Sequence, residues 1–296
     1  MVDLCTSHPG SWIPAINEMD DVKVVALHDD GGVRPEGYAA EFAAEQGIDT
    51  VTETIDEMVG MVDAAIVHSA NWDLHLPHAK PFIEAGVPVL VDKPMVGNLQ
   101  DLHELQRLQA KHGTLVMGGS SVRYAAEVQE LCALREEMGE IGVCWCQGRT
   151  DFFNYGIHTV EMFQGFCGAG VLAVEHVGDR GTMEVFRADY ADGVPVFFAL
   201  GAISSPWFIS IGAKNGVFER VLTAKDNYAR LIRAFVDAVT SGEPPISLAD
   251  NLEAVQVSLA AKVSRREGTI CYLSDLSNDE RFDGYAFAEE YAKLRQ

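Results

Sequence analysis

Apolar runs with the character of β-strands alternate with helical stretches through the first 119 residues. The expected strands are Val2–Thr6, Val22–His28, Asp63–Ser69, Val87–Val91 and Thr114–Met117. Between them, apolar residues recur with helical spacing over Ile13–Met19, Tyr38–Gln46, Pro77–Ala85 and Leu99–His112. Strand and helix alternating at this rhythm predict parallel strands joined by right-handed crossovers. Residues 1–119 are therefore expected to form a Rossmann-type, doubly wound α/β domain.

The pattern changes after about Gly119. A helix is expected over Ala125–Glu137, and strand then follows strand without a helix between them. The strand candidates are Gly142–Arg149, Leu172–Val177, Thr182–Phe186, Val194–Leu200 and Phe208–Ile211, followed by helices over Asn227–Ser241 and Ala249–Arg266. Residues 120–296 should thus form an α+β domain with an open, mostly antiparallel sheet, whose free face would suit pairing with a second copy.

Composition narrows the classes of partner. The formal net charge is −22 and no block rich in Lys or Arg offsets it, which argues against nucleic acid as a partner. No apolar run reaches the roughly 18 residues needed to span a bilayer, and the six cysteines are irregularly spaced. Cys144 and Cys146 have no second Cys/His pair at a metal-binding spacing. We expect a cytoplasmic, reduced protein that acts on small molecules, with no metal and no membrane partner.

The loop Thr6–Trp12 occupies the place where a dinucleotide-binding fold carries its glycine-rich turn. Of the three usual glycines only Gly10 is present, so fewer backbone amides can approach a pyrophosphate. Ser7 and Ser11 could donate hydrogen bonds instead, with Trp12 completing the loop. A plain strand-to-helix turn with Ser11 as its N-cap explains the same residues and stays open as an alternative.

Two charged residues follow later strands. Asp29 ends the second expected strand, at nearly the spacing from the loop at which a carboxylate binds an adenosine ribose and repels a 2′-phosphate. We therefore expect NAD rather than NADP. Lys93 follows the strand that ends at Val91 and should face the ligand crevice, where it could bond a substrate hydroxyl and assist proton transfer. An acidic turn and a solvated lysine are the alternative interpretations.

An aromatic-rich turn over 151–155 leads through Gly156 into an apolar helix. It brings Asn154 and His158 close together in the sequence, and a histidine can take a proton from an alcohol as hydride leaves its carbon. A structural histidine at the start of a helix is the alternative.

With these residues in this order, the chain resembles the Gfo/Idh/MocA oxidoreductases, named for glucose-fructose oxidoreductase and inositol dehydrogenase. The order and spacing of several segments carry the resemblance over nearly the whole chain. These segments are Val24–Asp29, Asn71–His75, Glu84–Gly86, Asp92-Lys93-Pro94, Gly156-Ile157-His158, Ala234-Phe235 and Glu243–Ile246. The resemblance implies a nicotinamide cofactor, a sugar, cyclitol or related polyol as substrate, and a homodimer or homotetramer assembled through the C-terminal sheet.

The resemblance also implies roles for individual residues. Asp92-Lys93-Pro94 looks like the family's Glu-Lys-Pro motif, which makes Lys93 catalytic, and His158 matches the active-site histidine. Asn154 stands where many members have an aspartate, and an amide cannot shuttle a proton. The further cofactor contacts expected are Ser69, Asn71, His75 and Asp92, and the further substrate contacts are Ser121, Arg123 and Tyr155.

Two other functions are compatible with these departures from the family pattern. One is a redox-inactive relative that binds a sugar-like ligand or a protein. The other is a glycoside-modifying enzyme that recycles its NAD and shows no net change in NADH.

Overall fold

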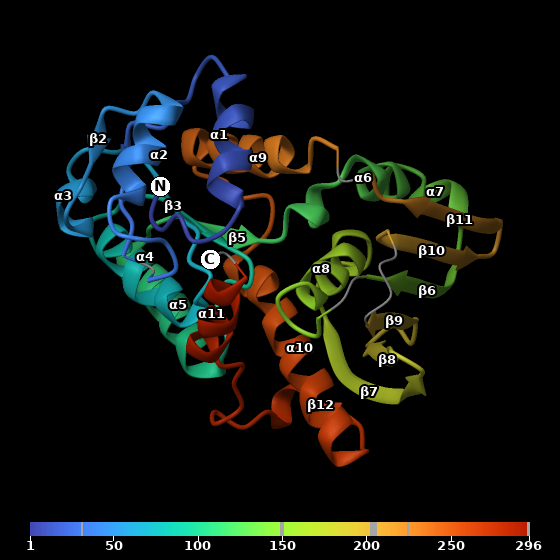
Figure 1. Ribbon diagram of the computed structural model, residues 1–296. Helices are drawn as coiled ribbons and strands as arrows, with labels where there is room; N and C mark the ends of the chain where they lie inside the picture. The colour runs from blue at the N-terminus through green and yellow to red at the C-terminus, as the bar shows by residue number, and fades with distance from the viewer. Residues whose placement is uncertain (31, 149–150, 202–205, 224, 295–296) are drawn as a thin grey trace. The chain divides into compact units, whose positions relative to one another are not determined.

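The computed structural model describes residues 1–30, 32–148, 151–201, 206–223 and 225–294, and these form two compact units (Figure 1). The first unit comprises Met1–Gly119, Leu231–Leu248 and the C-terminal segment from Phe282; the second comprises Ser120–Arg230 and Ala249–Arg281. The first break follows Gly119, where the strand pattern changes. The sequence predicts a single domain over residues 120–296, whereas two segments of that range, Leu231–Leu248 and the segment from Phe282, belong to the first unit.

Parallel strands form the sheet of the first unit. β1 (Ala26–Leu27) pairs with β2 (Thr50–Val51), while β3 (Ala65–Val67), β4 (Val89–Asp92) and β5 (Val116–Gly119) form a second parallel group. Val2 joins the two groups through parallel bridges to His28 and Val67. The order β2, β1, Val2, β3, β4, β5 is the strand order of a Rossmann fold, so the predicted doubly wound fold is confirmed.

Helices flank this sheet. They are α1 (His8–Asn17), α2 (Tyr38–Gln46), α3 (Ile55–Val59), η1 (Trp72–Leu74), α4 (His75–Glu84) and α5 (Leu99–His112), with most of α9 (Asn227–Ser241) and all of α11 (Gly284–Lys293). The bounds of α2, α5 and α9 are those that the sequence predicts. Gly118 of β5 is required by close packing, because a Cβ there would collide with the Val91 carbonyl oxygen of β4.

Helix α11 was not predicted, and it packs against η1 in the same unit. The Trp72 indole Nε1 donates to the Phe282 carbonyl oxygen at 2.9 Å, and its ring lies 4.8 Å from that of Phe287. At Gly284 the backbone passes so close to Asn71 that a Cβ would collide with its side-chain oxygen. The C-terminal helix therefore supports the loop that follows β3.

The second unit is built on a seven-stranded sheet with the order β11-β10-β6-β9-β8-β7-β12. Within this sheet, only the β6–β9 pair is parallel among the described strands, so the predicted open, mostly antiparallel sheet is confirmed. The strands are β6 (Ile141–Gln147), β7 (Val171–Arg180), β8 (Met183–Tyr190), β9 (Pro195–Gly201), β10 (Phe208–Ala213), β11 (Gly216–Val221) and β12 (Cys271–Tyr272). The helices are η2 (Ser121–Tyr124), α6 (Ala126–Ala133), α7 (Arg135–Met138), α8 (Gly156–Cys167), α10 (Leu248–Glu267) and η3 (Leu273–Asp275).

One face of this sheet forms the core of the second unit. Cys144 and Cys146 of β6 alternate with half-buried neighbours and lie on the buried face, as do Phe186 and Phe198. On the opposite face Trp145 stacks on Phe197, with ring centroids 6.2 Å apart. Assembly of two copies through this face stays a prediction. No described helix combines the length and the apolar character needed to cross a membrane.

Candidate active site

The structure gathers the predicted cofactor residues at one edge of the first unit's sheet. The loop Thr6–Trp12 follows the Val2 segment, Asp29 follows β1, Ser69 and Asn71 follow β3, and Asp92-Lys93 ends β4. Because parallel strands end at the same edge, all of these lie at the carboxyl edge, where ligands bind in doubly wound folds.

Asp92 is the centre of this edge. Its Oδ2 meets Nδ1 of His8 at very short range and lies 3.4 Å from Nδ1 of His68, while its Oδ1 accepts from the Lys93 amide at 2.7 Å. Burial opposes ionisation of this carboxyl, but the charges and hydrogen bonds of the two histidines hold its pKa well below the usual value. The carboxylate thereby fixes the backbone of Lys93.

His8 and His68 are site residues that sequence reasoning missed. The His8 ring stacks on Trp12, with centroids 5.5 Å apart, and the His68 ring meets the same indole edge-on at 4.6 Å. Burial lowers the pKa of His68, which favours its neutral form. The sequence could have indicated both histidines, because each lies within a few residues of the end of a strand at this edge.

The loop before Trp12 offers few amides to a phosphate group. Helix α1 begins at His8, whose amide donates to Thr6 Oγ1 at 3.1 Å, and Pro9 has no N–H. The Ser11 amide donates to the Ser7 carbonyl oxygen at 3.2 Å. Ser11 lies inside α1, so the interpretation of Ser11 as the N-cap was wrong; Ser7 holds that position.

Two side chains from beyond β1 satisfy the backbone at the end of the first strand. Asp29 Oδ1 accepts from the Leu4 amide at 2.9 Å. Arg34, which sequence reasoning missed, donates to the carbonyl oxygens of Leu4 at 3.0 Å and Thr6 at 3.4 Å and lies over the Tyr38 ring. These bonds explain why the expected strand Val2–Thr6 is reduced to Val2.

His75 joins the segments that follow β3 and β4. It is fully buried, with Nε2 2.9 Å from the Ser69 carbonyl oxygen and Nδ1 2.9 Å from that of Pro94. Burial lowers the pKa of His75, so the neutral ring donates to one of these oxygens in either tautomer. Ser69 Oγ in turn accepts from the Asn71 amide at 3.2 Å. These residues support the Lys93–Pro94 segment, and their contact with a cofactor stays a prediction.

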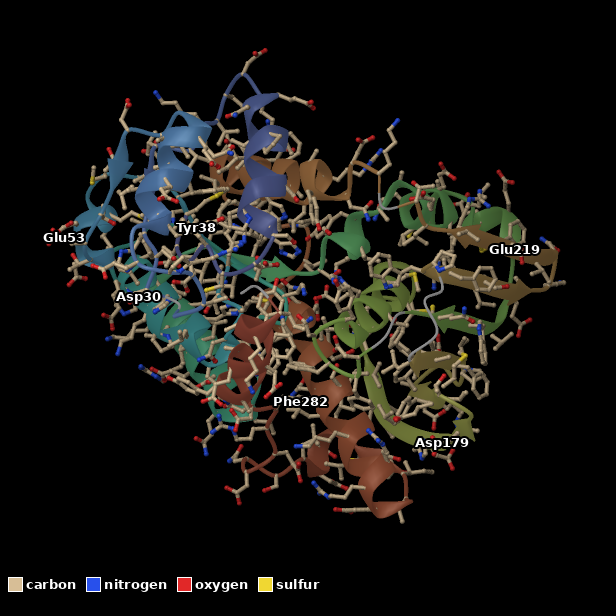
Figure 2. The ribbon with its side chains drawn as sticks, viewed as in Figure 1. Asp30, Tyr38, Glu53, Asp179, Glu219 and Phe282 are labelled. Atoms are coloured by element: carbon tan, nitrogen blue, oxygen red, sulfur yellow. The ribbon has the colours of Figure 1, made fainter. Side chains whose placement is uncertain are left out.

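A second buried network lies beside this edge. Asp3 is fully buried with a positive φ of 63°, and its Oδ2 lies 2.8 Å from Nδ1 of His78. Asp30, labelled in Figure 2, is half exposed and lies 3.3 Å from the other ring nitrogen of His78. Burial raises the pKa of Asp3, but the His78 bond and charge outweigh it and lower the pKa overall. Burial alone would lower the pKa of His78, but the carboxylates of Asp3 and Asp30 outweigh burial and raise the pKa overall.

The His78 contribution to stability should depend on pH. Because the pKa of His78 is raised, this histidine stabilises the fold below pH 6.5, and the stabilisation is lost as the pH rises through its folded-state pKa. Because the pKa of Asp3 is lowered, this aspartate stabilises the fold above pH 3.8, and the stabilisation is lost as the pH falls through its folded-state pKa. We expect His78→Gln to lower the unfolding free energy by about 1–3 kcal/mol between these values and by less at about pH 9. Urea denaturation of this variant and of the exposed control His103→Gln measures it. An equal loss at every pH would contradict the charged pair.

In the second unit, His158 lies in the first turn of α8. Its Nδ1 is 2.5 Å from Ser120 Oγ, which also accepts from the Val122 amide at 3.0 Å. The ring meets Trp207 edge-on at 5.2 Å and lies 5.8 Å from the Tyr155 ring. Ser120 and Trp207 therefore set the orientation of the imidazole, and neither was predicted.

Asp151 organises the turn before α8. Its Oδ1 accepts from the amides of Phe153 at 3.1 Å and Tyr155 at 2.9 Å, and its Oδ2 lies 3.4 Å from Asn154 Nδ2. Asn154 and Tyr155 are thus held on the turn that leads to His158, and Tyr155 is 39% exposed.

Arg123 is committed to a buried ion pair within the second unit. Its Nε lies 2.7 Å from Glu161 Oε2 and its Nη2 lies 3.0 Å from Gln164 Oε1, while Glu161 Oε1 accepts from the Ser120 amide at 3.0 Å. Burial raises the pKa of Glu161, and the guanidinium opposes that shift. The structure gives Arg123 a supporting role beneath Ser120. The predicted substrate contacts of Arg123 and of the buried Ser121 remain predictions.

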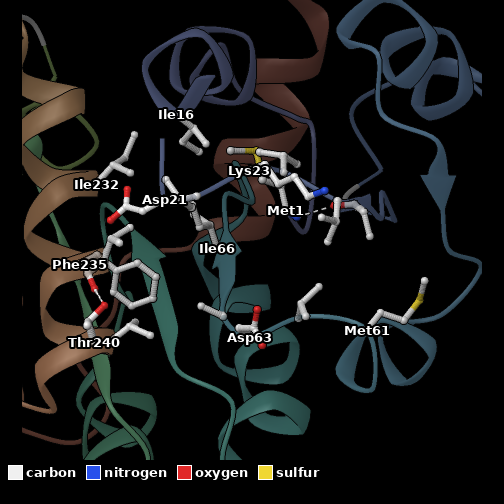
Figure 3. Close-up of a pocket in the computed structure, with 18 of the residues that line it drawn as sticks. Met1, Ile16, Asp21, Lys23, Met61, Asp63, Ile66, Ile232, Phe235 and Thr240 are labelled. Carbon is white, nitrogen blue, oxygen red and sulfur yellow. Dashed lines mark hydrogen bonds between the residues drawn. The ribbon is translucent and has the colours of Figure 1, made fainter. Parts of the chain in front are cut away.

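A cavity of about 590 Å³ lies at the opposite edge of the first unit (Figure 3). Met1, Lys23, Asp63 and Ile66 line it together with Phe235 of α9. It is beside the amino ends of β1 and β3. Cofactors bind at the carboxyl ends of such strands, so this cavity is not the candidate site.

The donor set at the carboxyl edge fits a nicotinamide dinucleotide. A carboxylate has about four lone-pair sites, so the bond from Leu4 leaves Asp29 able to accept from a ribose. Lys93 and His8 supply cationic or N–H groups near the end of β4 and the start of α1. The loop offers a pyrophosphate fewer backbone amides than a glycine-rich turn would, because the amides of His8 and Ser11 are bonded within the loop.

Comparison with known proteins agrees with this geometry. Residues 11–120 match the Gfo/Idh/MocA family model, described as an oxidoreductase family with an NAD-binding Rossmann fold. A protein named as the oxidoreductase subunit of a UDP-kanosamine synthase in Amycolatopsis mediterranei is 31% identical over 130 residues, which are 44% of this chain and 35% of that protein. The 1,5-anhydro-D-fructose reductase of Ensifer adhaerens is 26% identical over 211 residues, 68% of this chain and 59% of the reductase. The chain thus spans about a third to three fifths of these curated relatives.

A solved structure shares the architecture. Scyllo-inositol dehydrogenase from Lactobacillus casei, with NAD(H) and scyllo-inositol bound, superposes with a TM-score of 0.80 at 16% identity, over 93% of this chain and 98% of that one. At this identity the likeness shows the fold. The family match begins at Ser11, near the end of the loop Thr6–Trp12 that lacks the glycine pattern. Residues 11–120 thus match the Gfo/Idh/MocA oxidoreductase family, and the chain shares the fold of the scyllo-inositol dehydrogenase.

Proposed function

We propose that this protein is an NAD-dependent dehydrogenase or reductase that acts on the CH–OH group of a sugar, cyclitol or related polyol. The observation that carries the proposal is Asp92-Lys93-Pro94 at the carboxyl end of β4 in a family whose Rossmann domain binds NAD. The inositol and anhydrofructose named for two of the similar proteins support a polyhydroxylated substrate. Asp29 supports NAD over NADP, since a carboxylate there repels a 2′-phosphate.

Lys93 acts on the substrate oxygen in this proposal. The bound nicotinamide supplies the hydride acceptor or donor at its C4 atom. The Lys93 ammonium donates a hydrogen bond to the reacting oxygen and stabilises the negative charge that develops on it. The Asp92 bond to the Lys93 amide, and the His75 bond to the segment that follows, hold the lysine backbone in place.

His158 takes the hydroxyl proton as hydride leaves the carbon, or returns it in the reverse direction. When His158 Nδ1–H donates to Ser120 Oγ, the lone pair of Nε2 is the one that can accept a proton. Trp207 and Tyr155 restrict the ring. Asn154 and Tyr155 position the substrate, and because an amide cannot move a proton, this falls to His158 alone.

A substrate screen tests the proposal. Purified protein with NAD and a panel of inositols, aldoses and anhydro sugars should produce NADH with at least one compound, and the carbonyl product should be identified by mass spectrometry. Substrate consumption without net NADH would instead indicate a glycoside-modifying enzyme that recycles its cofactor. Binding of a sugar without turnover or cofactor binding would indicate the redox-inactive relative, and either result would overturn the proposal.

Ser120 should act as a positioning residue for His158. We expect Ser120→Ala to lower kcat about tenfold, the equivalent of one hydrogen bond, and to move the pH at which kcat is half-maximal. The matched control is Ser258→Ala, a buried serine whose hydroxyl bonds to the Ala254 carbonyl oxygen in α10. A Ser120 variant that loses stability but keeps the wild-type pH profile would show that the contact is only structural.

A further inference from the structure

The loop at the start of α1 offers fewer backbone amides to a phosphate than a glycine-rich turn does. The His8 and Ser11 amides are bonded within the loop, and Pro9 has none to offer. The carbonyl oxygens of Leu4 and Thr6 are held by Arg34. A side chain that meets the charge of the pyrophosphate would therefore strengthen the binding of a dinucleotide at this edge.

His8 has the right position and support for this task. It is the first residue of α1, at the helix end whose dipole favours an anion. The Asp92 carboxylate accepts from Nδ1, and the ring stacks flat on Trp12, so its plane and its orientation are both fixed. The second ring nitrogen then lies on the other side of the ring from Asp92.

Exposure distinguishes His8 from its neighbours. The side chains of Asp92 and His68 are 2% and 0% exposed, whereas that of His8 is 12% exposed. Of the three groups in this cluster, His8 is the one that a ligand can reach. Asp92 is buried beneath it and holds its carboxylate against Nδ1 of His8.

We propose that His8, oriented by Asp92 and Trp12, binds the cofactor's pyrophosphate and takes the place of the glycine-rich turn. The inference rests on the proposed function, since it assigns a residue to the cofactor of the same site. Asp92 then has two tasks: its Oδ2 orients the phosphate-binding histidine and its Oδ1 holds the amide of Lys93. Cofactor binding and the placement of the catalytic lysine are linked through one buried carboxylate.

Binding measurements with three His8 variants test the proposal. His8→Phe keeps an aromatic ring against Trp12 but has no N–H, whereas His8→Arg supplies N–H donors at the same position. We expect His8→Phe to weaken NADH binding about 10- to 100-fold, as for the loss of a charged hydrogen bond, and His8→Arg to stay within about threefold of wild type. His8→Ala should resemble His8→Phe. Calorimetric titration measures the Kd, and circular dichroism checks the fold.

Two further arms identify the group that His8 contacts. ADP-ribose contains the pyrophosphate but no nicotinamide, so it should lose affinity by the same factor as NADH. His103→Phe, at an exposed position of α5, should bind both ligands as the wild type does. All titrations contain EDTA, because donor atoms of His8, His68 and Asp92 lie within 4.8 Å of one another and could hold a metal ion.

The outcomes separate this inference from the proposed function. Wild-type binding with no change in His8→Phe would overturn the inference alone. An equal loss of affinity in His8→Arg and His8→Phe would also overturn the inference, because the packing of the ring and not its N–H group would then matter. A loss of affinity for NADH but not for ADP-ribose would overturn it as well. Absence of NADH binding to the wild type would overturn the proposed function and this inference with it.

Discussion

Replacement of Lys93 by methionine should lower kcat by about 10²- to 10³-fold, the range typical of a lost donor that stabilises charge on the reacting oxygen. Methionine keeps much of the length and apolar stem of lysine but cannot donate to the substrate oxygen. The Asp92 carboxylate accepts from the backbone amide of residue 93, and methionine keeps that amide. The backbone at this position should therefore stay in place. Steady-state kinetics with the substrate found by screening, together with the NADH Kd, measures the effect.

The control for Lys93→Met is Lys80→Met on α4. Lys80 is 48% exposed and lies 3.9 Å from Glu84, an exposed pair of small energetic value. It should retain wild-type kcat and Kd. Undiminished turnover in Lys93→Met would remove the lysine from the mechanism, and lost NADH binding in that variant would show that its role is in binding.

The largest effect on stability should come from Arg123→Leu. This change leaves the Glu161 carboxyl buried without its guanidinium partner at 2.7 Å, and breaking such a pair costs about 3–5 kcal/mol of unfolding free energy. The double variant with Glu161→Leu should recover much of the loss, because no buried charge then remains. Chemical denaturation followed by circular dichroism measures both variants.

Arg107→Leu provides the matched comparison on the surface. Arg107 also pairs with a glutamate, Glu104, at 2.6 Å, but their side chains are 56% and 35% exposed. Its loss should lower the unfolding free energy much less than the loss of Arg123 does, because water screens the pair. If Arg123→Leu were equally mild but raised KM strongly, Arg123 would be the substrate contact expected from the sequence and not a structural ion pair.

The helices of the first unit could be predicted closely where local capping defines them. Asn98 accepts from the Asp101 amide at 2.8 Å to begin α5, and Gly113, with a φ of 69°, ends it. Gly37 and Gly47 flank α2 in the same left-handed conformation. These signals lie within a few residues of the helix ends, so they can be read directly from the sequence.

The first strand and the loop after it could not be predicted in the same way. Apolar character suggested a strand over Val2–Thr6 and a helix from Ile13, whereas only Val2 pairs and α1 begins at His8. The bonds of Leu4 to Asp29 and Arg34, which are 25 and 30 residues away, replace the ladder there. Such side-chain bonds are not visible in the hydrophobic pattern.

Contacts across long stretches of sequence also complete the candidate site. His8 and Asp92 are in contact although they are 84 residues apart in the sequence, and Ser120 and His158 are 38 residues apart. Neither contact could therefore be inferred from neighbouring residues. The family resemblance located Asp92, Lys93 and His158. It could not reveal His8 or Ser120, because both depend on how this chain packs around those residues.

The most direct test of this account is a calorimetric titration of the purified wild-type protein with NADH and NADPH, after denaturation and mass spectrometry to exclude nucleotide already bound. We expect one NADH per chain with a micromolar Kd and weaker binding of NADPH, since a carboxylate at position 29 would repel a 2′-phosphate. The absence of both nicotinamide binding and retained nucleotide would contradict the account and favour a redox-inactive binding protein.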